Sequence, residues 1–187
     1  NLDKEGRNIV SLEDPIEYSV AGVNQSQIAP DIGYTFANGL RSILRQDPDV
    51  IMVGEIRDAE TAELAVQAAL TGHLVFSTIH TNTAISTITR LVEMGIPHYL
   101  IAPTVRLIIG QRLVHKLVPE TDAPQELIPI EGGYKEMVKT QFGDLPPEFL
   151  ANLPFKDSFH SPKPSERNRT GMEGRIAVFE MLPVDTE

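Results

Sequence analysis

Three groups of polar residues follow apolar runs of the sequence, and their types suit phosphate chemistry. Glu55 follows the apolar run 50–53 after a single glycine, and this run predicts a buried strand. At the carboxyl end of such a strand in an open α/β sheet, an acid points to where phosphates would lie. Carboxylates there can bind a divalent cation, often through water, and can orient or deprotonate an attacking water. The other two groups are Glu13, Asp14 and Glu17 after the run 9–12, and Ser77, Thr78 and His80 at the end of the run 74–78.

Each group taken singly also has an ordinary structural explanation. An acidic turn after a core strand would account for Glu55, and Glu13 and Asp14 stand before a proline, as turn residues do. His80 could be a hydrogen-bonded histidine at a strand end, and His73 could hydrogen-bond to the end of its helix. A metal site made of both histidines and a carboxylate is a further alternative, although seven residues of strand and turn need not bring the two rings together.

The chain up to about residue 118 alternates short apolar runs with helical patterns, which is typical of βαβ units around a mostly parallel sheet. The run 74–78 begins with three consecutive apolar residues, so we expect it to be a central strand. Because the carboxyl ends of parallel strands meet at one edge, the three polar groups should lie together. The predicted strands are 9–12, 23–28 (weaker, and suited to a sheet edge), 50–53 and 74–78.

Two amphipathic helices are predicted between these strands. Thr35 is the expected N-cap of the first helix. Asp58 is the expected N-cap of the second helix, which is expected to end at Gly72 in a left-handed conformation. Arg41 and Arg45 stand four residues apart on the first helix, either as a solvated basic edge or as contacts to a carboxylate or phosphate. The expected buried faces are Phe36, Leu40, Ile43 and Leu44 in the first helix, and Ala62, Ala65, Val66, Ala69 and Leu70 in the second.

Composition excludes several classes of protein. The 187 residues, 41% hydrophobic and 22% charged, predict one globular domain, or one with an appended subdomain. A net charge of -10 argues against nucleic acid or an anionic membrane surface as the main partner. The sequence has no cysteine, and no run of about 20 apolar residues that predicts a transmembrane segment. It also lacks the Gly-Xaa-Ser-Xaa-Gly and His-Glu-Xaa-Xaa-His motifs of acyl transfer and zinc proteolysis.

The character of the chain changes after residue 118. Prolines become frequent and periodicity weakens, with short helices expected only at 134–142 and 147–153. Apolar strand character returns at 174–182. The predicted organisation is a core at 1–118, an irregular Pro-rich appendage at 119–170, and a strand and tail at 171–187.

Segments 11–18, 40–58 and 72–82 together closely resemble the Asp box, Walker B box and His box of the secretion ATPases, the GspE/PulE and PilB-like motors of type II secretion and type IV pilus assembly. The resemblance covers residues 8–118, and 171–182 match more weakly. It implies a RecA-like P-loop NTPase core in a cytoplasmic homo-hexamer, peripheral at the inner membrane. Such a motor hydrolyses ATP with Mg²⁺ and acts on an inner-membrane platform protein.

The resemblance also implies roles for individual residues. Glu55 corresponds to the Walker B glutamate that polarises the attacking water. The Asp-box carboxylates would organise water and magnesium near the γ-phosphate, with Asp14 and Glu55 holding Mg²⁺ through water. His73 and His80 correspond to the pair that reports on the nucleotide. The implied catalytic residues are Glu55, Glu13, Glu17 and His80, and the implied nucleotide-binding or subunit-contact residues are Asp14, His73, Arg57, Arg41 and Arg45.

Two departures from the family pattern affect these expectations. The phosphate loop Gly-Xaa4-Gly-Lys-Ser/Thr is not in the 187 residues, and the family places it just upstream of residue 1. We therefore expect a fragment that is inactive in isolation. Many assembly motors hold zinc through four cysteines in the region matching 117–174, and without cysteine we expect no zinc. The alternatives are a non-catalytic oligomerisation or interaction module with the same fold, and a metal-dependent hydrolase using the same carboxylates.

Overall fold

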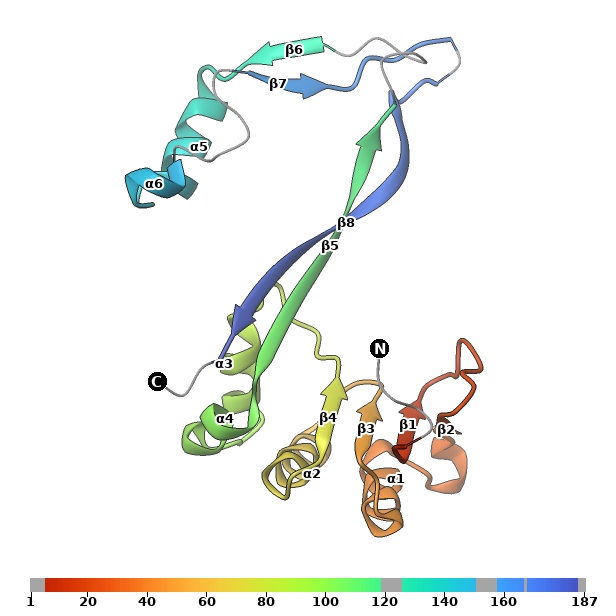
Figure 1. Cartoon of the computed structure of the whole chain (residues 1–187). Helices are drawn as coiled ribbons and strands as arrows, with labels where there is room; N and C mark the ends of the chain where they lie inside the picture. The colour runs from red at the N-terminus through yellow and green to blue at the C-terminus, as the bar shows by residue number, and fades with distance from the viewer. Residues whose placement is uncertain (1–5, 119–125, 151–157, 167, 185–187) are drawn as a thin grey trace. The chain divides into compact units, whose positions relative to one another are not determined.

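The computed structural model describes residues 6–118, 126–150, 158–166 and 168–184 (Figure 1). The chain divides into two compact units, residues 1–111 with 179–187, and residues 112–178. All three polar groups singled out by the sequence lie in the first unit.

A four-stranded parallel sheet forms the centre of the first unit (Figure 1). In the register of this sheet, Ser11 lies opposite Gln25 on one neighbouring strand and opposite Met52 on the other. The sequence predicts each strand to within two residues at either end, and the α/β class with a parallel sheet is confirmed. The strands are β1 (Ile9–Glu13), β2 (Asn24–Gln27), β3 (Val50–Val53) and β4 (Leu74–Ser77), in the order β2-β1-β3-β4.

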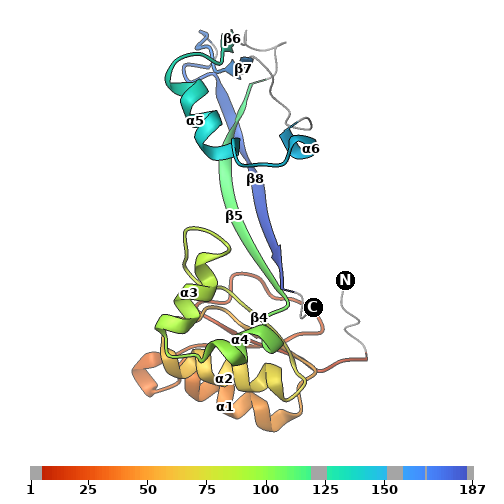
Figure 2. The same cartoon turned by 90° about the vertical axis from the view of Figure 1, so that its left-hand side faces the viewer.

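Two helices, α1 (Phe36–Ile43) and α2 (Ala59–Leu70), pack against one face of this sheet (Figure 2). Their caps are as predicted. Thr35 accepts a hydrogen bond from the N–H of Asn38 at 3.3 Å, and Asp58 accepts one from the N–H of Thr61 at 2.8 Å. The other helical elements of this unit are η1 (Pro30–Ile32), η2 (Leu44–Gln46), α3 (Ser86–Glu93) and α4 (His98–Thr104).

Helix α2 is covered from two directions, and this explains where the predicted buried face is wrong. Ala65 and Ala68 belong to the cluster formed with the sheet, whereas Ala62 and Val66 pack in a second cluster with residues of α3 and α4. Leu70, which the periodicity predicts to be buried, is 46% exposed. The spacing of apolar residues predicts one buried face of a helix. It does not predict burial against two partners that lie on different sides of the helix.

The expectation that the strand at 74–78 is central is not met within the described residues, where β4 is the last strand of the sheet. Leu74 and Phe76 are 41% and 47% exposed, and Met52, opposite Phe76, is 38% exposed. Apolar side chains on both faces indicate that a strand suits the interior of a protein. This pattern does not indicate which other elements cover the two faces of the strand.

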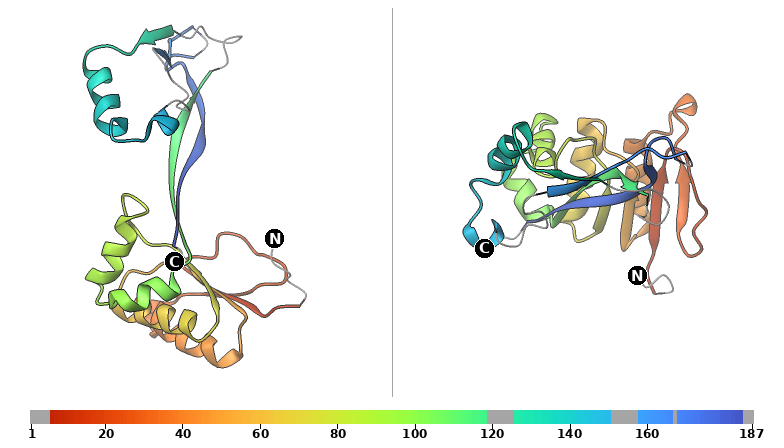
Figure 3. Two further views of the ribbon diagram at one scale, coloured as in Figure 1. Left: turned by 60° about the vertical axis from the view of Figure 1, so that its left-hand side comes forward. Right: turned by 90° about the horizontal axis from the view of Figure 1, so that it is seen from above.

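The remaining strands form two-stranded sheets. β5 (Leu107–Leu117) pairs with β8 (Met172–Pro183). In the second unit, β6 (Glu126–Pro129) pairs antiparallel with β7 (Ser158–Ser161), a pairing that the sequence does not predict (Figure 3). The two helices there are α5 (Gly133–Phe142) and α6 (Pro147–Leu150), close to the predicted 134–142 and 147–153, although residues 151–153 lie outside the described part.

Of the helices in the described ranges, none is long and apolar enough to cross a membrane.

At Gly39, helix α1 approaches the sheet closely. A Cβ atom at this position would lie 2.7 Å and 3.1 Å from the two methyl carbons of Leu12, whose side chain is fully buried. It would also lie 3.3 Å from the ring of Tyr34. The absence of a side chain at Gly39 therefore lets α1 pack tightly on β1.

Gly39→Ala is expected to destabilise the protein, although alanine is the better helix former. Leu12 would have to leave its position in a filled core, and overpacking of this kind costs about 1–3 kcal/mol. Urea unfolding monitored by circular dichroism measures the loss. Ser42→Ala, on the same helix, is the matched control and should change stability by less than about 0.5 kcal/mol. Equal stability of Gly39→Ala and the wild type would contradict the close packing.

Candidate functional site

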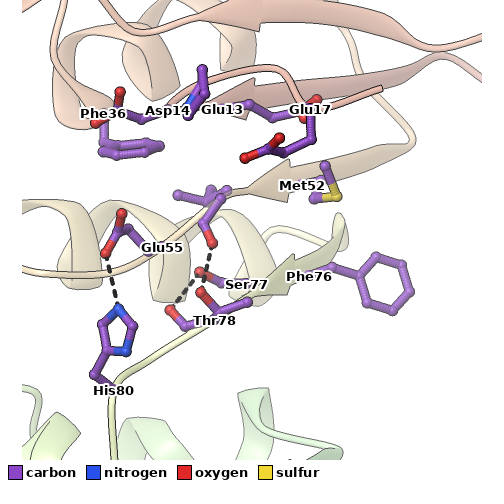
Figure 4. Close-up of a pocket in the computed structure, with 13 residues that line it drawn as sticks. Glu13, Asp14, Glu17, Phe36, Met52, Glu55, Phe76, Ser77, Thr78 and His80 are labelled. Atoms are coloured by element: carbon purple, nitrogen blue, oxygen red, sulfur yellow. Dashed lines mark hydrogen bonds and ion pairs between the residues drawn. The ribbon is translucent and has the colours of Figure 1, made fainter. Parts of the chain in front are cut away.

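A pocket of about 460 Å³ lies at the carboxyl ends of β1, β3 and β4 (Figure 4). The structure thus brings together members of all three polar groups that the sequence singles out. Their side chains come from strand ends that are distant in sequence but adjacent in the parallel sheet. The polar lining includes Glu13, Asp14, Glu17, Glu55, Thr78 and His80.

Glu55 is the most buried acid of the pocket, with 9% of its surface exposed. The N–H of Gly54 donates to the carbonyl of Leu12 at 2.8 Å, so the β1–β3 ladder continues up to the residue before Glu55. A Cβ atom on Gly54 would lie 3.0 Å from that carbonyl oxygen, so the glycine permits this close approach. Glu55 therefore leaves the sheet at a defined point and turns into the pocket (Figure 4).

Two side chains contact the Glu55 carboxylate, both at Oε2. Arg57 donates through Nε at 2.5 Å, and Nε2 of His80 lies 3.4 Å away. Both of these contacts engage the same oxygen of Glu55. Glu55 is thus paired with a cation through Oε2.

Arg57 compensates the charge that Glu55 carries into the pocket. The hydrogen bond to Glu55, and then the negative charge of that residue, hold the pKa of Arg57 above its ordinary value. The guanidinium is therefore charged at every pH at which the protein is folded. Since the Arg57 side chain is 62% exposed, water screens the pair and the guanidinium can move away without being buried elsewhere.

The residues 13–20, here called the acidic loop, begin at the last residue of β1 and carry the other carboxylates. Asp14 and Glu17 are exposed at the pocket. The Asp14–Pro15 peptide is cis. Glu13 is held more firmly, because its Oε1 accepts hydrogen bonds from Ser11 at 2.5 Å and from Gln25 at 2.8 Å.

Thr78 ties β4 to the segment that carries Glu55. Its hydroxyl donates to the carbonyl of Gly54 at 2.7 Å, and its own carbonyl accepts the N–H of Ile56 at 2.9 Å. The two bonds reach the residues on either side of Glu55. The backbone that presents the buried acid is therefore held from β1 and from β4.

Four of the predicted site residues are not among those that line this pocket. Arg57 contacts the pocket acid Glu55, and the other three lie elsewhere. His73 contacts the carbonyl of Ala68 through Nδ1 at 2.9 Å, as in the ordinary explanation of a histidine at a helix end. Arg41 forms an ion pair with Glu60 of α2. Arg45 is exposed in η2. The roles that the resemblance implies for these three residues stay predictions.

Two contacts of the site have little or no signal in the sequence. Gln25 reaches Glu13 from the neighbouring strand, and only the alternation of the weak strand 23–28 hints that it shares a face with Ser11. Glu180 of β8 accepts the N–H of Ala84 at 2.8 Å and so anchors the segment that follows His80. The two residues are 96 positions apart, and no local pattern joins them.

The parallel sheet, with polar groups at its carboxyl edge, is of the α/β class, and solved structures of secretion ATPases with the RecA-like P-loop fold are similar to it. The family described as "Type II/IV secretion system protein" matches residues 1–187, and the chain belongs to it.

Two relatives with named functions are similar to this chain over nearly all of its length. The chain is 56% identical over 184 residues to "Type II secretion system ATPase E" of Vibrio cholerae, covering 98% of this chain and 34% of the relative. It is 46% identical over 186 residues to "Type IV pilus assembly ATPase PilB" of Acinetobacter baylyi, covering 100% of this chain and 30% of the relative. The chain therefore spans about a third of the length of these relatives.

A solved structure supports the fold directly. The crystal structure of "the Pilus Retraction Motor PilT and Bound ADP" is 46% identical, with a TM-score of 0.55, over 60% of this chain and 36% of that one.

Thr78→Val is expected to weaken the support of Glu55. The change keeps the shape of the side chain but removes the donor to the Gly54 carbonyl, and one lost hydrogen bond lowers the free energy of unfolding by about 1 kcal/mol. Thr78→Ser keeps the hydroxyl and serves as the control, with a change of less than about 0.5 kcal/mol. Urea unfolding measures both. If the two variants were equally stable, the hydroxyl bond would contribute nothing.

Proposed function

We propose that this chain is the catalytic part of an ATP-hydrolysing motor subunit of type II secretion or type IV pilus assembly. The observation that carries the proposal is the buried Glu55, which faces the acidic loop and His80 across one pocket. The names of the relatives, secretion ATPase and pilus assembly ATPase, agree in the reaction and differ in the system. The proposal therefore specifies ATP hydrolysis and leaves both systems open.

Glu55 is proposed to polarise the attacking water. Its Oε2 is engaged by Arg57, and its Oε1 is the oxygen directed to a water in this proposal. A carboxylate that is mostly shielded from solvent and held at both flanking residues can accept a proton from a water in a fixed position. ATP bound with Mg²⁺ would supply the γ-phosphoryl group for this water; the new P–O bond would form as the bond to the β-phosphate breaks, with ADP as the leaving group and Glu55 as the acceptor of the proton of the water.

The acidic loop is proposed to hold magnesium through water, with Asp14 and Glu55 as the nearest protein ligands. In the described residues, no three histidine, aspartate or glutamate side chains are close enough to hold a metal ion directly. Magnesium commonly keeps several waters and binds one or two carboxylates together with phosphate oxygens. The exposed oxygens of Asp14 and Glu17, beside Glu55, fit that mode and do not fit a cage made only of protein ligands.

The acidic pocket needs positive charge and backbone donors to hold a triphosphate. Arg57 and His80 are the groups of the described pocket region that can supply such charge. No Gly-Xaa4-Gly-Lys-Ser/Thr loop is present in the 187 residues. In our proposal the phosphate cradle therefore comes from another part of the complete protein.

The proposal also covers how the motor subunits assemble. We propose a cytoplasmic homo-hexamer, peripheral at the inner membrane, that acts on an inner-membrane platform protein. Arg41 and Arg45 are exposed on α1 and η2 and are the proposed subunit-contact or network cations, and His73 keeps its proposed role in reporting the bound nucleotide.

Glu55→Gln in the complete protein is expected to abolish turnover while sparing ATP binding. The amide keeps the shape of the side chain but cannot accept the proton, and loss of a general base lowers kcat by about 10²–10⁴-fold. Steady-state phosphate release and equilibrium binding of a fluorescent ATP analogue measure the two effects.

Glu63→Gln, an exposed glutamate of α2 outside the pocket, is the matched control and should leave kcat unchanged. Unchanged hydrolysis by Glu55→Gln would overturn the catalytic assignment. If the complete wild-type protein binds no ATP at all, the alternative of a non-catalytic oligomerisation module replaces it.

His80→Ala is expected to lower kcat by at least about tenfold with little change in ATP affinity, because His80 contacts the oxygen of Glu55 that also binds Arg57. Single-turnover hydrolysis at saturating ATP isolates this effect from binding. His98→Ala, an exposed histidine of α4, is the control. A parallel loss in both variants would mean that His80 has no special role.

A further inference from the structure

The side chain of Gln25 makes three hydrogen bonds to the acidic loop and its base. Nε2 donates to Oε1 of Glu13 at 2.8 Å and to the carbonyl of Tyr18 at 2.9 Å. Oε1 accepts the N–H of Val20 at 2.7 Å. One side chain on β2 thus contacts the loop at its start, its middle and its end.

These three bonds use both N–H donors of the carboxamide and one acceptor site of its oxygen, in one orientation. The amide nitrogen has two hydrogens, which go to Glu13 and Tyr18, and the oxygen receives Val20. A carboxylate at this position could accept from Val20 but could donate to neither of the other two groups. The arrangement therefore specifies glutamine, and the position of the side chain follows from the sheet register, in which Gln25 lies opposite Ser11.

Packing contributes little to the position of the acidic loop. Tyr18 is 82% exposed and Val20 is 38% exposed, and Glu17 is exposed as well. Buried apolar contacts cannot hold such a segment in one conformation, so polar contacts must do it. Ser11 and Gln25 both bond to Oε1 of Glu13, and Gln25 alone of these two also reaches Tyr18 and Val20.

We propose that Gln25 is a positioning residue for the hydrolysis reaction, which holds the acidic loop so that Asp14 and Glu17 face Glu55 across the pocket. The inference rests on the proposed function, because it assigns Gln25 to the same site. Gln25 does not itself line the pocket, and its contact with the lining is the hydrogen bond to Glu13. It acts through Glu13 and through the backbone at Tyr18 and Val20.

The test uses Gln25→Ala and Gln25→Glu in the complete protein. Hydrogen exchange followed by mass spectrometry reports on peptides covering residues 14–23, which include the Val20 N–H. Both variants should exchange faster in this segment. Phosphate release as a function of ATP and of Mg²⁺ should show kcat lower by about tenfold or a half-saturating Mg²⁺ concentration higher by about tenfold, as for the partners that orient a ligand in other sites. The KM for ATP should stay within about threefold.

Gln27→Ala, two residues along the same strand and exposed, is the matched control. It should change neither exchange at 14–23 nor the kinetics. Faster exchange in Gln25→Ala with unchanged kcat and unchanged Mg²⁺ dependence would overturn the inference, and so would unchanged exchange. Because Gln25→Glu keeps the length of the side chain, it distinguishes lost donors from lost packing.

If the proposed function is wrong, the Glu55→Gln variant will hydrolyse ATP at an unchanged rate. The exchange measurement needs no nucleotide and does not depend on that result. Loss of turnover in Glu55→Gln together with normal kinetics in Gln25→Ala would reject the positioning role alone.

Discussion

The parallel pairing of β1 with β3 positions both the core of the first unit and the acids of the pocket. Leu12 and Val53 are fully buried partners in this ladder, and the ladder continues by one more bond to Gly54. The same pairing places Glu13 and Glu55 at one edge of the sheet. A slip of one residue would turn every side chain of β1 to the opposite face, so the register that buries the core also aims the carboxylates.

Several carboxylates line the pocket, and two of them are stabilised in different ways. Glu55, the buried acid, is paired with the cation Arg57, whereas Glu13 is held by the neutral donors Ser11 and Gln25. A charged partner that is itself exposed can leave when another cation or a water competes for the carboxylate. Neutral donors within the sheet fix a position without cancelling its charge. Glu55 is thus suited to change partners, and Glu13 to stay in place.

Much of the first unit could be predicted from local patterns. Apolar runs with polar ends identified the strands, and Thr35 and Asp58 cap their helices as the sequence predicts. Prediction failed where burial depends on elements remote in sequence. Leu70 is exposed because α2 meets the sheet and the helices α3 and α4 on other sides. The β6–β7 pairing was missed because the strands are short and join segments with weak alternation.

The class of fold, the three polar groups and the family can be predicted from the sequence, because strand periodicity and motif spacing are local properties. The contacts of His80 and Arg57 with one oxygen of Glu55, and the turn of His73 to the end of a helix, are seen only in the folded chain. The same is true of the three hydrogen bonds between Gln25 and the acidic loop. Such contacts depend on sheet register and side-chain direction, which arise only when distant strands pair.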